Sequence, residues 1–224
     1  MSFSALNCPL SAKVIVLYEV FFILNIRGAF MVAKIALKLV SWMETEKMIG
    51  KNEKVYYEYA LITMIERIIT IGTVLLVGMV FRQVIPTICF LVFFLSLRKR
   101  TGGYHADKFW QCYFMTIITY IVVMQFSLFL FENPAIMYSM LFFAVITIGV
   151  IGTVNHPNMD MDRKELQEVK KVARLCVFIE TVIIVLLIVL KIEGLYVCYM
   201  SSAIILCAAL LYVAKIAKQE VKLQ

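Results

Sequence analysis

The chain has 224 residues, of which 62% are hydrophobic and only 17% are charged, and its mean hydropathy is +0.90. Soluble domains average about 45–50% apolar and about 25% charged residues, so a soluble core of this size could not bury so much apolar surface. The composition therefore excludes an ordinary soluble enzyme and predicts one membrane domain. The net charge of +7 does not indicate a nucleic-acid partner, because membrane proteins collect Lys and Arg in their cytoplasmic loops.

In chain order, the first predicted element is a basic amphipathic helix over residues 31–48. At helical spacing Lys34 and Lys38 share one face, whereas Leu39 and Val40 lie on the apolar face. A helix of this kind lies in the headgroup region of a bilayer; the alternative is a helix packed on the protein's own cytoplasmic face. We interpret residues 1–30 as an N-terminal extension.

Six apolar segments follow, and each is predicted to be an α-helix because lipid requires every backbone hydrogen bond to be satisfied within the segment. The second has about 15 residues, fewer than the roughly 20 that a span needs, so the alternative for it is a re-entrant segment. The predicted fold class is all-α, a polytopic membrane protein of about six transmembrane helices plus an N-terminal interfacial helix. The segments cover residues 57–80, 83–97, 113–131, 135–154, 175–190 and 195–214.

The distribution of basic residues predicts the orientation of these spans. With the N-terminus in the cytoplasm, seventeen Lys and Arg residues fall on the cytoplasmic side, and only Arg82 and Lys191 fall in the opposite loops. The positive-inside rule thus predicts a multi-pass protein of the cell membrane with both termini in the cytoplasm. The polar stretch RKRTGGYHADKFWQC, residues 98–112, lies on that side as well.

This polar stretch contains a histidine and a cysteine that could form a catalytic pair. A thiolate is a good nucleophile, and an imidazole can take its proton and return it to a leaving amine. On one straight helix the Cα atoms of His105 and Cys112 would be about 10 Å apart, at 1.5 Å per residue, which is too far for contact. A working pair therefore needs the chain to turn back between them.

The residues around the pair suit such a turn. Gly102 and Gly103 permit a positive-φ turn, and Asp107 is a reasonable N-cap for the next helix. The helix N-terminus and the basic run Arg98-Lys99-Arg100 would favour a thiolate at Cys112. The alternative is that His105 and Cys112 are incidental, that the basic run only sets topology, and that the glycines form a plain turn; His156 is a reserve base on the same side.

Ionisable groups inside the spans are candidates for contacts or function. Glu66 could orient His105 or hold Arg98, and the alternative is a structural pair with a basic neighbour. Gln125 and Glu180 are expected to make interhelical contacts. The cysteines of the apolar segments are expected to pack as small hydrophobes, and no cysteine pair has the spacing of a metal site or of a disulfide framework. Neither a metal nor another cofactor is expected.

Arg98, Gly103, His105 with Ala106, and Cys112 resemble in order and spacing the signature of the AgrB (accessory gene regulator B) family. Its members are integral membrane cysteine endopeptidases of bacterial quorum sensing. The resemblance covers about residues 31–224 and includes the basic lead-in helix, a glutamate in the first span, and a later cytoplasmic loop, here HPNMDMDRK. We therefore expect 31–224 to form an AgrB-like peptidase domain, with residues 1–30 outside it.

The resemblance implies that Cys112 is the nucleophile and His105 the general base and acid. Arg98 and Gly103 match positions that the family needs for activity, and Lys99, Arg100, Gly102 and Glu66 are candidate supporting or substrate-positioning residues. The implied substrate is a small AgrD-like propeptide, whose acidic C-terminal tail is removed and whose acyl-enzyme thioester is captured as a thiolactone or lactone ring. The implied partners are this propeptide, the bilayer and a second copy in a homodimer, with no nucleic acid.

Two other classes compete with this interpretation. A non-catalytic transporter or peptide-binding membrane protein would leave His105 and Cys112 incidental, but transporters usually show broken helices in paired halves, and the sequence has no such symmetry. A different membrane thiol enzyme, such as a lipid acyltransferase, would normally carry a denser cluster of Cys and His residues than this chain has.

Overall fold

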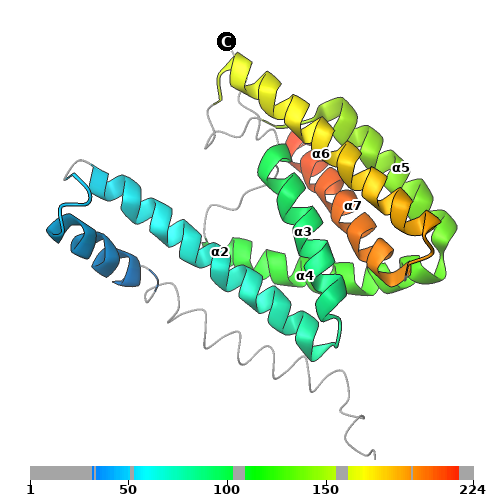
Figure 1. The fold of residues 1–224 in the computed structure, drawn as a ribbon, viewed down its shortest axis with the longest axis horizontal. Helices are drawn as coiled ribbons and strands as arrows, with labels where there is room; N and C mark the ends of the chain where they lie inside the picture. The colour runs from blue at the N-terminus through cyan, green and yellow to red at the C-terminus, as the bar shows by residue number, and fades with distance from the viewer. Residues whose placement is uncertain are drawn as a thin grey trace, which may run out of the picture. The chain divides into compact units, whose positions relative to one another are not determined.

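The computed structural model describes residues 32, 34–50, 53–102, 109–154, 161–192 and 194–216, and the regular structure within these ranges is helical throughout (Figure 1). Residues 34–45 form a first helix. Each of the six predicted apolar segments coincides largely with one of the helices that follow, which confirms the all-α fold class. These are α2 (Lys54–Val80), α3 (Val84–Thr101), α4 (Phe109–Glu132), α5 (Pro134–Ile151), α6 (Arg163–Val189) and α7 (Gly194–Ile216).

Among the described residues, five helices are long and apolar enough to cross a membrane, namely α2, α4, α5, α6 and α7. The chain is therefore a multi-pass membrane protein. Helix α3 is the short second segment of the sequence prediction. It has 18 residues, and its last turn contains Arg98, Lys99 and Arg100, so it carries too many charges for its length to be among the candidate spans. The sixth crossing stays a prediction.

Helix α6 begins twelve residues before the predicted apolar segment, at Arg163. A capping box starts it: Asp162 Oδ1 accepts from the Arg163 amide at 2.6 Å, and Glu165 Oε2 accepts from the Asp162 amide at 3.2 Å. These bonds satisfy amides that a helix start leaves unpaired. The polar first turns can therefore be helical outside the apolar span, which a prediction from hydropathy alone does not include.

The contacts divide the chain into two units. The first contains the described residues up to Thr70 together with the start of α4, up to Tyr113. In it, the helix over residues 34–45 is joined to α2 by a short turn, and Lys54 Nζ lies 2.7 Å from Glu44 Oε2. This ion pair links the start of α2 to the end of the preceding helix.

The helix over residues 34–45 has two apolar stripes rather than one. Val32, Ala36 and Val40 are buried at helical spacing, so this stripe packs against protein. A second stripe beside it, which includes Leu39 and Trp42, is exposed. Packing on the protein and lying in the headgroup region are therefore compatible for this helix, because the two stripes are different. Contact of the exposed stripe with lipid stays a prediction.

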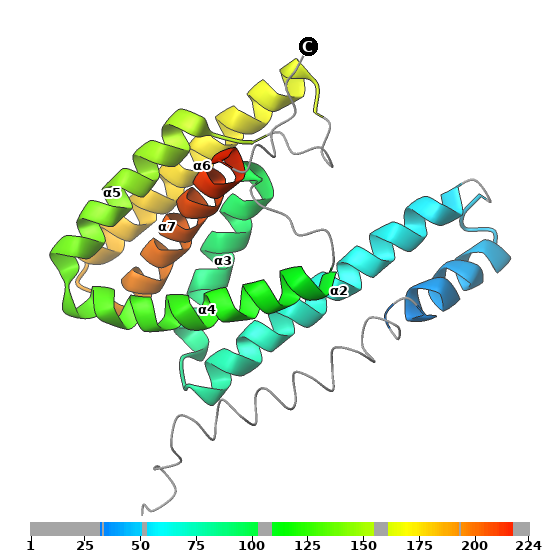
Figure 2. The same ribbon diagram turned by 180° about the vertical axis from the view of Figure 1, so that it is seen from behind.

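Helix α7 is the centre of the second unit. It packs against α3, α5 and α6, which run alongside it in Figures 1 and 2. Of its apolar window 61% is buried, against 33% or less in each of the other four candidate spans. The small residues Ser201, Ser202, Ala203 and Ala208 lie in this helix and are buried, and small side chains allow helices in lipid to approach closely.

Helix α4 is fixed to α3 and α7 by polar side chains. The Tyr120 hydroxyl lies 2.5 Å from the Thr87 hydroxyl of α3, and the Tyr120 ring lies 5.7 Å from the ring of Phe90. Ser127 and Ser202 share a hydrogen bond of 2.9 Å between α4 and α7. Buried polar groups of this kind need partners where no water is present, so these pairs restrict how the helices can pack.

Thr87 also lies against Gly78 near the end of α2, and this close contact gives a test of the packing. A Cβ added at Gly78 would collide with the Thr87 hydroxyl and lie 3.0 Å from the Thr87 Cβ, whereas one at Gly72 would meet nothing within 4 Å. We expect Gly78→Ala to lower the free energy of unfolding by about 1–3 kcal/mol. Gly72→Ala is expected to leave it unchanged or raise it by up to about 1 kcal/mol. Unfolding in mixed detergent micelles measures the free energy of unfolding of both variants. Equal changes in the two variants would contradict the close contact between Gly78 and Thr87.

Candidate functional site

The basic run at the end of α3 divides into side chains with different surroundings. Lys99 is exposed, whereas Arg98 and Arg100 are half-buried. Arg98 Nη1 donates to the carbonyl of Gly102. Arg100 Nη1 donates to the Ser96 carbonyl at 2.7 Å. The two arginines thus bind backbone carbonyls near the C-terminus of α3, the end of a helix that favours cations.

Gly102 ends α3 in a conformation that suits glycine. Its φ is 67°, as the sequence analysis predicted for a turn here, and a Cβ at this position would lie 3.0 Å from the Val154 carbonyl oxygen. Any other L-residue would meet both backbone strain and a close contact. Gly103, the second glycine of the predicted turn, lies outside the described residues.

The segment after α5 holds the end of α3. The Thr153 hydroxyl donates to the Arg100 carbonyl at 2.8 Å, and the Val154 amide donates to the Thr101 carbonyl at 3.2 Å. Val154 in turn packs with Leu211 and Ala214 of α7. The C-termini of α3, α5 and α7 therefore meet at one end of the second unit, and the basic run lies at this end.

Cys112 is placed in the first turn of α4, and its residue is exposed. Its position close to a helix N-terminus agrees with the sequence analysis. A thiol that is exposed there is accessible to a reactant. His105, Asp107, Lys108 and His156 lie outside the described residues, so the pairing of His105 with Cys112 stays a prediction.

Glu66 lies in α2 and is half-buried. Its main-chain carbonyl accepts from the Thr70 hydroxyl at 2.8 Å. Within the described part of the chain neither Glu66 nor Arg67 takes part in an ion pair, so the expected pairing with a basic neighbour is not observed there. A role of Glu66 towards His105 or Arg98 stays a prediction.

The sequence analysis missed a polar cluster that joins α3 to α6. Cys176 was expected to pack as a small hydrophobe, but its Sγ lies 3.1 Å from the Ser96 hydroxyl of α3. Glu180, expected to contact another helix, interacts with the Ser96 side chain of α3 and also accepts from Cys176 Sγ on its own helix at 3.5 Å. The signal was present in the spacing, because Ser96 and Arg100, like Cys176 and Glu180, are four residues apart and share a helix face.

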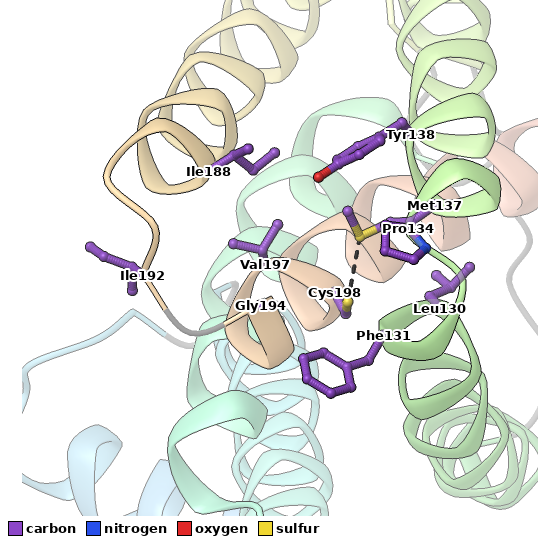
Figure 3. A pocket seen from close by; sticks show the side chains of 10 residues that line it. All are labelled: Leu130, Phe131, Pro134, Met137, Tyr138, Ile188, Ile192, Gly194, Val197 and Cys198. Carbon is purple, nitrogen blue, oxygen red and sulfur yellow. Dashed lines mark hydrogen bonds between the residues drawn. The ribbon is translucent and has the colours of Figure 1, made fainter.

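A cavity of about 190 Å³ lies at the opposite end of the second unit, between α4, α5, α6 and α7 (Figure 3). Its walls are mostly apolar, and inside it Cys198 Sγ lies 3.4 Å from Met137 Sδ. None of the predicted site residues lines it. Its lining residues are Leu130, Phe131, Pro134, Met137, Tyr138, Ile188, Ile192, Gly194, Val197 and Cys198.

Comparison with protein families gives one match, to the model described as AgrB: Accessory gene regulator B, over residues 32–215. This match covers most of the chain and includes the basic run, the two adjacent glycines, His105 and Cys112. No curated protein and no solved structure matches the chain.

The turn at Gly102 gives a prediction for the site's framework. We expect Gly102→Ala to lower the free energy of unfolding by about 1–2 kcal/mol, because alanine is strained at positive φ. Gly149→Ala is the matched control, since a Cβ at this helical position would meet nothing within 4 Å. Thermal unfolding of both variants in detergent micelles tests this, and a Gly102→Ala variant as stable as the control would contradict it.

Proposed function

Because the chain belongs to the accessory gene regulator B family, whose activity is autoinducer propeptide processing, we propose that it is a membrane-embedded cysteine endopeptidase. Its substrate is a small AgrD-like propeptide, and it removes the C-terminal tail of that peptide. The observation that carries the proposal is the family match across residues 32–215. It includes the cysteine that the structure places, exposed, in the first turn of α4.

The reaction assigns one role to each member of the pair. His105 takes the proton of the Cys112 thiol, and the thiolate attacks a peptide carbonyl carbon of the precursor. The tetrahedral intermediate collapses, the C–N bond breaks, and His105 returns the proton to the departing amine. The tail leaves, and the N-terminal part of the precursor stays on Cys112 as a thioester.

The thioester explains how a ring can form without an added energy source. A cysteine or serine within the precursor attacks the thioester carbonyl, and Cys112 leaves as the thiol. Exchange of one thioester for another is nearly thermoneutral, so the energy of the acyl bond is retained in a thiolactone; a serine gives the lactone. The precursor supplies this second nucleophile, and the protein needs no cofactor for either step.

The basic end of the second unit is the proposed recognition surface for the acidic tail. Lys99 is exposed there and free to attract a carboxylate, and opposite charges accelerate and orient association. Arg98 and Arg100 bind backbone carbonyls, so we assign them the shaping of this end. Gly102 and Gly103 would allow the chain to turn towards α4, and Glu66 is proposed to orient His105.

The membrane arrangement follows the distribution of charge. We place the basic end, both termini and the reaction in the cytoplasm, as the positive-inside rule predicts. The apolar surfaces of α2, α4, α5 and α6 suit contact with lipid. Pairing of two copies stays a prediction of the family resemblance.

Substitution of Cys112 tests the proposal directly. In cells that co-express the short propeptide encoded beside the gene, Cys112→Ala is expected to reduce tail removal by at least about 1,000-fold, since it removes the nucleophile. The matched control is Cys89→Ala, which changes a half-buried cysteine of α3 and is expected to process normally. Mass spectrometry of the peptide gives the extent of cleavage. Full processing by Cys112→Ala would reject the peptidase and favour a transporter.

A further inference from the structure

Four side chains form a polar cluster between α3 and α6, outside the residues assigned to the reaction. Arg100 Nη1 donates to the Ser96 carbonyl at 2.7 Å and the Ser96 hydroxyl at 3.3 Å, and lies 3.7 Å from Cys176 Sγ. Cys176 Sγ lies 3.1 Å from the Ser96 hydroxyl and 3.5 Å from Glu180 Oε1. The contacts therefore run from a cation at the end of one helix to a carboxyl group within another.

Glu180 is the buried end of this cluster. It is only 5% exposed, and within the described part of the chain its Oε2 has no hydrogen-bond partner. A buried carboxylate is costly unless a countercharge and hydrogen bonds compensate it. Arg100 is the cation at the other end of the cluster, with Ser96 and Cys176 between them. Removing the Ser96 hydroxyl or the Cys176 thiol would leave the Glu180 carboxyl group with fewer polar partners.

We propose that Ser96, Arg100, Cys176 and Glu180 form a clamp that fixes the last turn of α3 on α6 and thereby holds the start of the segment that follows α3. This rests on the proposed function, because that segment contains His105. In this account Cys176 and Glu180 are positioning residues that do not touch the substrate. Cys176, which was expected to pack as a small hydrophobe, links the two helices in this proposal.

The position of Arg100 explains why the clamp affects the reaction. Its main-chain carbonyl accepts from Thr153, and its side chain makes the clamp contacts. It is thus held from two directions, two residues before the turn at Gly102. Catalysis depends on placing reacting groups to within about an ångström, and a displacement of that size can cost roughly 100-fold in rate. A last turn free to move would displace the start of the segment that contains His105.

The test compares three cysteine variants of the full chain in lipid vesicles with the propeptide encoded beside the gene. Cys176→Ala removes the bridge and is expected to lower kcat about tenfold with little change in KM, because ground-state binding is untouched. Cys176→Ser keeps a hydrogen-bonding group and is expected to recover most of the rate. Cys198→Ala is the control, a buried cysteine at the opposite cavity, expected to behave as the unmodified protein.

Hydrogen exchange gives a readout that needs no substrate. The backbone amides of residues 97–102 are expected to exchange about tenfold faster in Cys176→Ala than in Cys176→Ser or Cys198→Ala, because local opening becomes easier. Unchanged exchange in Cys176→Ala would overturn the clamp. A Cys176→Ser variant whose kcat is as low as that of Cys176→Ala would overturn it as well. The proposed function has a separate test. If it is wrong, Cys112→Ala still processes the propeptide, whatever the exchange at residues 97–102 shows.

Discussion

The hydrogen bonding of carbonyls at the end of α3 is the constraint on which the proposed site depends. The last carbonyls of a helix have no partner within it, so they need donors from other parts of the protein or from water. Here Thr153 and Val154 donate to the carbonyls of Arg100 and Thr101. The Arg98 side chain donates to the carbonyl of Gly102, just past the helix, and the Arg100 side chain adds a donor to the Ser96 carbonyl one turn earlier. Residues about fifty positions apart thus fix the point where the chain leaves α3 towards α4.

This arrangement allows the basic run three tasks. A basic segment beside a membrane helix sets topology by its charge alone, and any Lys or Arg would serve for that. The forked guanidinium groups of Arg98 and Arg100 additionally bind backbone carbonyls, which the geometry of Arg suits better than that of Lys. Lys99, between them, is exposed. One short run can therefore orient the protein, shape the end of α3 and still present positive charge to an acidic peptide.

The sequence predicted the helices well because lipid leaves few alternatives for an apolar segment. It also predicted the positive-φ turn at Gly102, since only glycine adopts that conformation easily. It did not predict the polar start of α6, where the capping of Asp162 matters more than hydropathy. It missed the cluster around Cys176, because the spacing places these residues on two helix faces but does not show that the two faces meet. The placement of His105 stays a prediction, while Cys112 lies where the spacing required.

The central claim is that Cys112 carries the precursor as a thioester, and trapping this intermediate tests it most directly. The full chain in vesicles is mixed briefly with the propeptide encoded beside the gene, quenched in acid, digested and analysed by mass spectrometry. The account predicts that the peptide containing Cys112 gains the mass of the precursor without its tail, and that neutral hydroxylamine, which cleaves thioesters, removes it. Release of the tail with Cys112 unmodified, or an adduct on another cysteine, would contradict the account.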